Sequence, residues 1–248
     1  MMKKFAKDSI VLNEVESTNN YANHLILSKA AEEGTVVLAR YQKQGRGQQN
    51  NQWESEPGKN LLASIVLFPR FLQAGKQFLI SKVISLALVD FLKNELEGVS
   101  IKWPNDLYVY DKKVAGILIE NSVKGDFLYS VIVGIGLNLN QLKFNSDAPN
   151  PVSLKYYTGK DYSDEQVATV LTENIFKWYE KLELGKFDEI DNRYFSNLFR
   201  RNKWTWFKKD DQKFEARISG IGEFGQLLLE DRIGNINSYL FKEVEFVI

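Results

Sequence analysis

The sequence KWPND at residues 102–106, followed by KVAGILIE at residues 113–120, places two lysines near a carboxylate in a short stretch of chain. Apolar residues before and within this stretch are typical of strands, so Pro104 lies at a strand end, where proline is tolerated. Its fixed φ angle and missing N–H would hold Asn105 and Asp106 in one geometry. Taken alone, the stretch also fits a hairpin with a polar turn. The two lysines favour an anion-binding site beside a carboxylate.

The composition is that of a folded protein without a membrane segment. The chain has 248 residues, of which 44% are hydrophobic, enough for one large domain or one domain with a small appendage. No apolar run approaches the ~18 residues of a membrane span, and the initial MMKKF leads into charged residues and not into a signal-peptide core. We therefore expect a soluble, cytoplasmic protein that does not bind membranes. The absence of cysteine agrees with a reducing compartment.

The same composition excludes several kinds of chemistry. Without cysteine there is no thiolate nucleophile, no thioester intermediate and no sulfur-ligated metal. The single histidine, His24, lies on a predicted helix among apolar residues and is expected to be structural, so a multi-histidine metal site and a Ser-His-Asp triad are excluded. The formal net charge of zero argues against a general nucleic-acid-binding surface.

The apolar patterns predict strands and helices that do not alternate regularly. This order favours an α+β fold with helices packed on a mixed, largely antiparallel sheet. Apolar residues between Ile80 and Leu92 recur at helical spacing and predict a helix that faces the sheet. Ser17 is predicted to cap the first helix and Gly34 to end it. The predicted strands cover residues 9–15, 35–39, 61–68, 99–102, 107–110, 113–121 and 127–138, and the predicted helices cover residues 19–31, 80–92, 163–181 and 187–200.

The pattern changes after Asn202. Residues 203–248 contain short apolar runs separated by turn residues, which predict a small β-barrel of roughly 45 residues. We therefore expect two domains, a catalytic domain at residues 1–202 and a small β-barrel domain at residues 203–248.

Three further blocks accompany the KWPND stretch. They are STN at residues 17–19, GRGQQNNQW at residues 45–53 and GIGLNLN at residues 134–140. In order and approximate spacing the four blocks resemble the biotin protein ligases, and the resemblance extends from about residue 10 to the C-terminus. It implies a sheet of the class II synthetase type followed by a small SH3-like barrel. The catalytic pattern starts where many of these enzymes still have a DNA-binding domain, so we expect a monofunctional ligase that does not bind DNA.

The resemblance implies a ligase reaction in two steps. The biotin carboxylate attacks the α-phosphorus of ATP to give biotinyl-5′-AMP, and a lysine of a biotin carboxyl carrier protein or domain then takes the biotin. The expected substrates are ATP and biotin, with Mg²⁺ bound mainly through the ATP phosphates. Such chemistry asks the protein mainly for positioning and for cations. A monomer and a homodimer both remain open.

The resemblance also assigns residues to the site. It implies that Lys113, Arg46 and Asp106 are catalytic, although Asp106 also fits a structural pair with a neighbouring cation. Ser17 fits both a ligand contact and a helix cap. It implies that biotin contacts Ser17, Thr18, Asn19, Gln42, Gly45, Arg46, Lys113, Gly116 and Gly134, and that ATP or the adenylate contacts Arg46, Gln48, Trp53, Lys102, Lys113 and Asn138.

The glycine-rich loop departs from the family pattern. That pattern usually reads GRGRxGRxW, whereas here Gln48 replaces the second arginine, Asn50 the glycine and Asn51 the third arginine. Two positive charges are therefore missing from the segment expected to cover the adenylate. The GIGLNLN block is not a dinucleotide fingerprint, because it lacks the third glycine and continues as a strand.

Two other functions compete with this interpretation. A lipoate-protein ligase also activates a carboxylate with ATP and uses a Lys-x-x-Gly element, but its usual glycine-rich arginine block with a nearby histidine is absent. A nonenzymatic biotin sensor is the alternative from another class, and the neutral charge speaks against a repressor.

Overall fold

The computed structural model describes residues 9–48, 51–145 and 150–247. Asn50, the initial MMKKF and part of the loop before Asn150 lie outside the described residues. The centre is a seven-stranded sheet in which β1 and β2 are parallel and the other neighbours are antiparallel, as predicted. In spatial order its strands are β1 (Ile10–Leu12), β2 (Val36–Ala39), β3 (Leu61–Leu67), β7 (Phe127–Leu137), β6 (Lys112–Lys124), β5 (Asp106–Val109) and β4 (Val99–Lys102).

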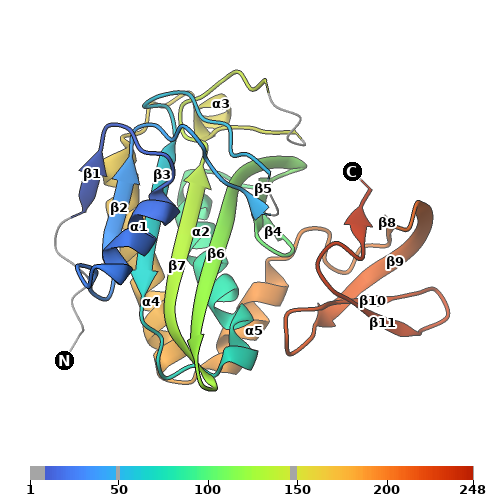
Figure 1. Ribbon diagram of the computed structural model, residues 1–248. Coiled ribbons are helices and arrows are strands. Elements are labelled where there is room, and N and C mark those ends of the chain that lie inside the picture. The colour runs from blue at the N-terminus through green and yellow to red at the C-terminus, as the bar shows by residue number, and fades with distance from the viewer. Residues whose placement is uncertain (1–8, 49–50, 146–149, 248) are drawn as a thin grey trace.

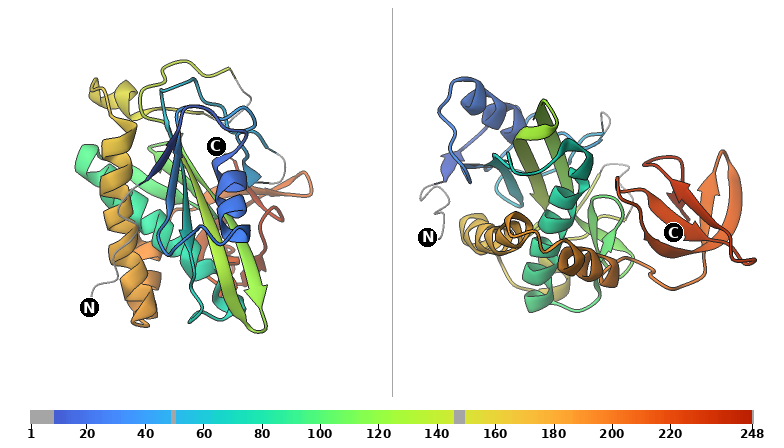
Figure 2. Two further views of the ribbon diagram at one scale, coloured as in Figure 1. Left: turned by 60° about the vertical axis from the view of Figure 1, so that its left-hand side comes forward. Right: turned by 90° about the horizontal axis from the view of Figure 1, so that it is seen from below.

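Helices cover both faces of this sheet (Figures 1 and 2). The helices α2 (Phe78–Glu95), α4 (Asp164–Glu183) and α5 (Phe187–Ser196) lie on one face, and α1 (Thr18–Leu27) lies on the other. Strand β2 shows why both faces are apolar: Val36 and Leu38 belong to the large core, while Val37 packs under α1. Successive strand residues point to opposite faces, so a strand that is buried on both sides reads as a continuous apolar run.

The first helix ends earlier than predicted. It stops at Leu27 and not at Gly34, because Lys29 adopts a left-handed conformation with φ of 59°. The N–H of Ala30 bonds to Leu25 O at 2.8 Å, and that of Lys29 bonds to Ile26 O at 3.1 Å. This is the Schellman arrangement that usually employs glycine. Lysine gives no sequence signal for it.

Other boundaries also differ. Ser17 occupies the N-cap position of α1, but its side chain makes no capping hydrogen bond. Two short helices were not predicted, the 3-10 helix η2 (Ala74–Lys76) and the helix α3 (Leu154–Thr158). The fifth α-helix ends at Ser196, before the predicted residue 200, and Arg200 has φ of 55°.

The C-terminal residues form a five-stranded antiparallel sheet beside β4 and β5 (Figure 1). Its strands are β8 (Thr205–Lys209), β9 (Gln212–Ile221), β10 (Leu227–Glu230), β11 (Ile236–Tyr239) and β12 (Glu245–Phe246) in the order β11-β10-β9-β8-β12. Trp103 Nε1 donates a buried hydrogen bond of 2.8 Å to Gly225 O, in the turn between β9 and β10. The predicted C-terminal β structure is therefore present, and it is joined to the KWPND segment.

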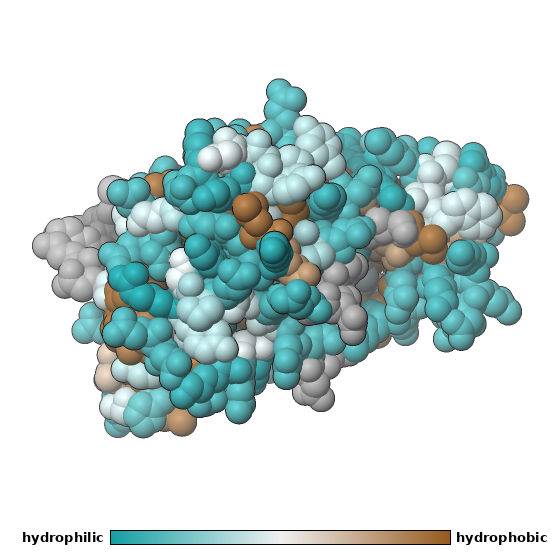
Figure 3. Space-filling model, turned by 90° about the horizontal axis from the view of Figure 1, so that it is seen from above, coloured by the Kyte–Doolittle hydropathy of each residue, from teal (hydrophilic) through white to brown (hydrophobic). Residues whose placement is uncertain are grey.

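Viewed from above, the molecule is mainly hydrophilic, with hydrophobic residues in small patches (Figure 3). Among the described residues, we find no helix with the length and apolar character of a membrane span.

Candidate active site

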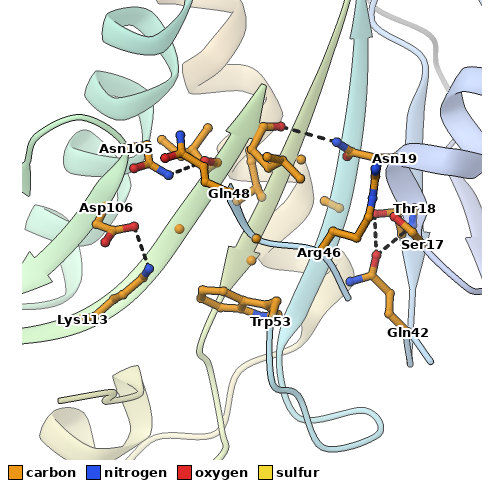
Figure 4. Close-up of a pocket in the computed structure, with 18 residues that line it drawn as sticks. Ser17, Thr18, Asn19, Gln42, Arg46, Gln48, Trp53, Asn105, Asp106 and Lys113 are labelled. Carbon is orange, nitrogen blue, oxygen red and sulfur yellow. Dashed lines mark hydrogen bonds and ion pairs between the residues drawn. The ribbon is translucent and has the colours of Figure 1, made fainter. Parts of the chain in front are cut away.

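Glycines of two paired strands line the floor of a pocket on the sheet. Figure 4 shows this pocket in close-up. In this pair, Gly116 of β6 lies opposite Gly136 of β7, and Leu118 lies opposite Gly134. A Cβ atom at Gly136 would lie 2.3 Å from the Trp53 ring, and one at Gly134 would lie 2.5 Å from Asn19 Oδ1. Both distances are shorter than any normal contact. The glycines are therefore required for the loop and the first helix to lie this close to the sheet.

One end of the pocket carries neutral hydrogen-bonding groups. Gln42 Oε1 accepts hydrogen bonds from the backbone N–H and the hydroxyl of Thr18, at 2.7 and 3.0 Å. The Ser64 hydroxyl lies 2.8 Å from Thr18 Oγ1 and 2.6 Å from Asn19 Oδ1. Ser17 is buried and lines the same end. Ser64 was not predicted as a site residue, because its only sequence signal is a hydroxyl within the apolar run LLASIVL.

The other end carries an ion pair. Lys113 Nζ lies 2.7 Å from Asp106 Oδ1, and both side chains are largely buried. The Lys113 ammonium also lies 5.6 Å from the centre of the Trp53 ring, within the range of a cation–π contact. Figure 4 shows this pair on one side of Trp53, with Thr18 and Gln42 on the other.

Arg46 forms a second ion pair at the pocket. One guanidinium nitrogen lies 2.9 and 2.8 Å from the two carboxylate oxygens of Glu120, and Asn19 Nδ2 donates to the same carboxylate at 2.6 Å. Glu120 was not predicted as a site residue either. The only sequence signal is its position, as an acidic residue at the end of the apolar run in KVAGILIE.

A wider cleft adjoins the pocket and reaches the C-terminal sheet. It has a volume of about 570 Å³ and shares Gln48, Trp53, Asp106 and Lys113 with the pocket. Lys102 lines it from β4, opposite Asp106 in the strand pair. Burial lowers the pKa of Lys102, and the negative charge of Asp106 partly offsets this effect.

The structure brings most of the predicted residues together. The residues from the prediction that line the pocket or the cleft are Ser17, Thr18, Asn19, Gln42, Arg46, Gln48, Trp53, Lys102, Asp106, Lys113, Gly116 and Gly134. Gly45 is not among the lining residues and lies behind them, where a Cβ would be 2.7 Å from Trp53 O. Asn138 is likewise not among them, and its buried amide donates to Val152 O at 3.1 Å. Its contact with adenine stays a prediction.

These features describe a site for an elongated ligand with a neutral polar end and an anionic end. Amide and hydroxyl groups can satisfy the neutral end. The cations can bind carboxylate or phosphate once the Asp106 and Glu120 carboxylates are displaced. An enzyme of the carboxylate-activating type has these requirements.

Comparison with known proteins identifies the family. The model of the biotin/lipoate A/B protein ligase family matches residues 11–138. The chain is 31% identical over 233 residues to a biotin–(acetyl-CoA carboxylase) ligase of Paracoccus denitrificans, covering 90% of this chain and 95% of that protein. It is 36% identical over 135 residues to the bifunctional ligase/repressor BirA of Bacillus subtilis, but this match spans only 53% of the chain and 41% of that protein.

A solved structure gives the same result. The biotin protein ligase from Aquifex aeolicus in complex with biotin and ATP superposes with a TM-score of 0.81 at 27% identity, covering 98% of this chain and all of that one. The chain belongs to the biotin/lipoate A/B protein ligase family. The Paracoccus and Aquifex proteins that it resembles are biotin protein ligases.

Proposed function

We propose that this protein attaches biotin to a lysine of a biotin carboxyl carrier protein or domain, with ATP as the activating substrate and biotinyl-5′-AMP as the intermediate. The observation that carries the proposal is the pocket itself, in which Thr18 and Gln42 lie on one side of Trp53 and Lys113 on the other. The Paracoccus relative is named as such a ligase, and the Aquifex protein binds biotin and ATP, which supports the assignment.

The neutral end suits the ureido ring of biotin. This ring has N–H donors and a carbonyl acceptor and carries no charge. Thr18, Asn19 and Gln42 offer matching hydroxyl and amide groups at this end of the pocket. The present cavity, about 60 Å³, is smaller than the ~300 Å³ at the lower end of ligand pockets. The pocket must therefore widen to admit the ring.

The first step brings two anions together, the biotin carboxylate and the ATP phosphates. Their repulsion is on the order of 4 kcal/mol per charge pair at ~4 Å and an effective dielectric constant of about 20. Arg46, Lys113 and Lys102 are the cations that we assign to offset it. Two of them already bind carboxylates, Glu120 and Asp106, at 2.7 to 2.9 Å. The incoming anions would take the places of those carboxylates.

Asp106 has a second role in this proposal. An acceptor lysine has a pKa near 10.4 and is mostly protonated at neutral pH, so the second step benefits from a carboxylate that orients or deprotonates it. Asp106 lies in the cleft, where an acceptor could approach. Once phosphate has drawn Lys113 away, the carboxylate becomes available. Asp106 would then pair with Lys113 before ATP binds and act on the acceptor lysine in the second step.

Mg²⁺ fits this site as a partner of ATP. Among the described residues, no cluster of three or more acidic or histidine side chains is suited to hold a metal ion. We propose that the ion arrives on the phosphates and neutralises their charge.

One experiment tests the function. The protein is incubated with Mg²⁺, ATP and a biotin carboxyl carrier domain, with either biotin or lipoate, and the intact mass of the carrier is measured. We expect a mass increase of one biotinyl group that requires ATP and is absent when the carrier lysine is replaced. Transfer of lipoate would favour the lipoate ligase alternative, and binding of biotin without modification of the carrier would favour a sensor.

A further inference from the structure

Of the three cations that we assign to the site, Lys102 is the one without an ion pair among the described residues. Arg46 binds Glu120, and Lys113 binds Asp106. Among the residues that the structure describes, no carboxylate lies within 4.0 Å of the Lys102 ammonium. Asp106 and Glu245, the carboxylates of the cleft whose charges act on Lys102, both lie beyond this distance.

Two aromatic rings hold this ammonium instead. Lys102 Nζ lies 5.3 Å from the centre of the Tyr108 ring and 5.5 Å from that of Phe246. An aromatic face attracts a cation through its quadrupole and carries no net charge of its own. The rings therefore restrain the position of the ammonium without supplying a negative charge that would pair with it. A carboxylate in place of the ring would compete with a phosphate for the same lysine.

Phe246 comes from the other end of the chain, in the last strand of the C-terminal sheet. Strand β12 pairs with β8, so that Phe246 lies opposite Phe207 with the ring centres 5.0 Å apart. The neighbouring Val247 is fixed by two hydrogen bonds, from its N–H to Trp206 O at 3.0 Å and from Arg200 to its carbonyl at 2.8 Å. These contacts with the C-terminal sheet fix Phe246, and its side chain lines the cleft.

We propose that Phe246 is a positioning residue for the first step of the reaction, which holds the Lys102 ammonium in the cleft at the place where the ATP phosphates bind. This inference rests on the proposed function. It makes the last strand of the C-terminal sheet part of the phosphate-binding machinery, although Phe246 itself need not touch a substrate. The cleft already contains both side chains and borders the Lys113 and Asp106 pair.

The test compares ring removal with ring replacement. Phe246→Leu keeps the apolar volume but lacks the aromatic face, whereas Phe246→Trp keeps the face. Phe214→Leu is the matched control, because Phe214 stacks on Phe207 and Tyr239 in the same sheet and does not contact Lys102. Biotin-dependent ATP–pyrophosphate exchange gives KM for ATP and for biotin separately, and thermal unfolding reports the folded state of each variant.

We expect Phe246→Leu to raise KM for ATP about five- to tenfold, from the loss of one cation–π contact, and to leave KM for biotin within about twofold. The tryptophan variant and the Phe214 control should stay close to wild type. In a Lys102→Met background, Phe246→Leu should add less than about a twofold change, because the lysine through which it acts is gone.

Equal effects of Phe246→Leu in both backgrounds, or equal increases of both KM values, would overturn the inference and assign Phe246 to packing alone. These outcomes require that the wild-type protein forms the adenylate. A wild-type protein without any exchange would instead refute the proposed function.

Discussion

Lys113 is the residue on which adenylate formation should depend most. It directly precedes the apolar run 114–119 of β6, contacts Asp106 at 2.7 Å and faces Trp53. We expect Lys113→Ala to reduce biotin-dependent pyrophosphate exchange by roughly two to three powers of ten, as for removal of one preorganised donor at a developing charge. The fold should remain, because the side chain is not part of the core. Exchange near the wild-type level would place Lys113 outside the chemistry.

Gly136 should be equally intolerant of change, for a steric reason. A methyl group there would lie 2.3 Å from the Trp53 ring and would push this ring off the floor of the pocket. Overpacking of this kind costs about 1 to 3 kcal/mol, so we expect Gly136→Ala to weaken ATP binding at least fivefold in a titration. Gly220→Ala is the control, since its methyl group would meet Leu228 at an ordinary 3.4 Å. Equal affinities of both variants for ATP would show that ATP binding does not depend on the close contact between Trp53 and Gly136.

At the scale of residues, the sequence predicts groups that belong to a compact motif and misses those that reach the site from elsewhere. Lys102, Asp106 and Lys113 lie within twelve positions of one another and could be found together. Ser64 and Glu120 contact Asn19 across 45 and 101 positions. Such contacts arise only when the sheet brings distant strands together, and a single serine or glutamate carries no local signal of them.

The loop from Gly45 to Trp53 is the element for which the sequence predicts a departure from the family pattern. Trp53 N–H bonds to Gly45 O at 2.8 Å, and Gly47 N–H bonds to Asn51 O at 2.6 Å, so the described part of the loop folds back on itself as a narrow hairpin. Gln48 extends from it into the pocket, and Oε1 has no hydrogen-bond partner among the described residues. A neutral amide there cannot make a charge-assisted bond to the adenylate phosphate.

We therefore expect the double variant Gln48→Arg, Asn51→Arg to release biotinyl-5′-AMP more slowly than the natural protein. Each charge-assisted bond contributes about 1.5 to 3 kcal/mol, so one effective arginine slows release about tenfold or more. The dissociation rate of the adenylate measures the effect, with Gln212→Arg, an exposed position in the C-terminal sheet, as the control for added charge. Unchanged or faster release would mean that other cations, such as Lys102, already satisfy the phosphate.

At the scale of elements, apolar periodicity located the strands well and the helix ends poorly. Strand β4 has the predicted bounds, because a short apolar run before a proline has few alternatives. The end of α1 was wrong by several residues, since hydrogen bonds to Leu25 and Ile26 close it at a lysine. Helix ends depend on backbone conformation, which lysine does not reveal.

For the whole molecule, the C-terminal sheet and the central sheet meet at the KWPND segment. Trp103 is 5% exposed, donates a hydrogen bond to Gly225 O and packs edge-on against Phe241. The sequence predicted a small β domain but not this contact, which joins residues 122 positions apart. Since Phe246 also faces Lys102, two adjacent residues of the motif depend on the C-terminal sheet for their environment.

We propose that the boundary between two domains lies near Asn202, and truncation after this residue tests it. The central sheet and its helices should stay folded, because their strand pairs are complete without β8 to β12. Uncovering the Trp103 side chain costs about 1.5 to 3 kcal/mol, so we expect the melting temperature to fall by at least about 4 °C. Ligation activity should fall by more than the loss of stability alone would cause, because Lys102 also loses its contact with Phe246.

Thermal unfolding and carrier biotinylation of the truncated chain measure the two effects separately. The full-length Trp103→Phe variant is the control, because it removes the bond to Gly225 but retains the C-terminal sheet and its contact with Lys102. Loss of cooperative unfolding on truncation would mean that the two sheets form one folding unit, as their shared apolar core allows. Full ligation by the truncated chain would show instead that the C-terminal sheet is dispensable, and that Lys113 and Arg46 supply sufficient positive charge for both anions.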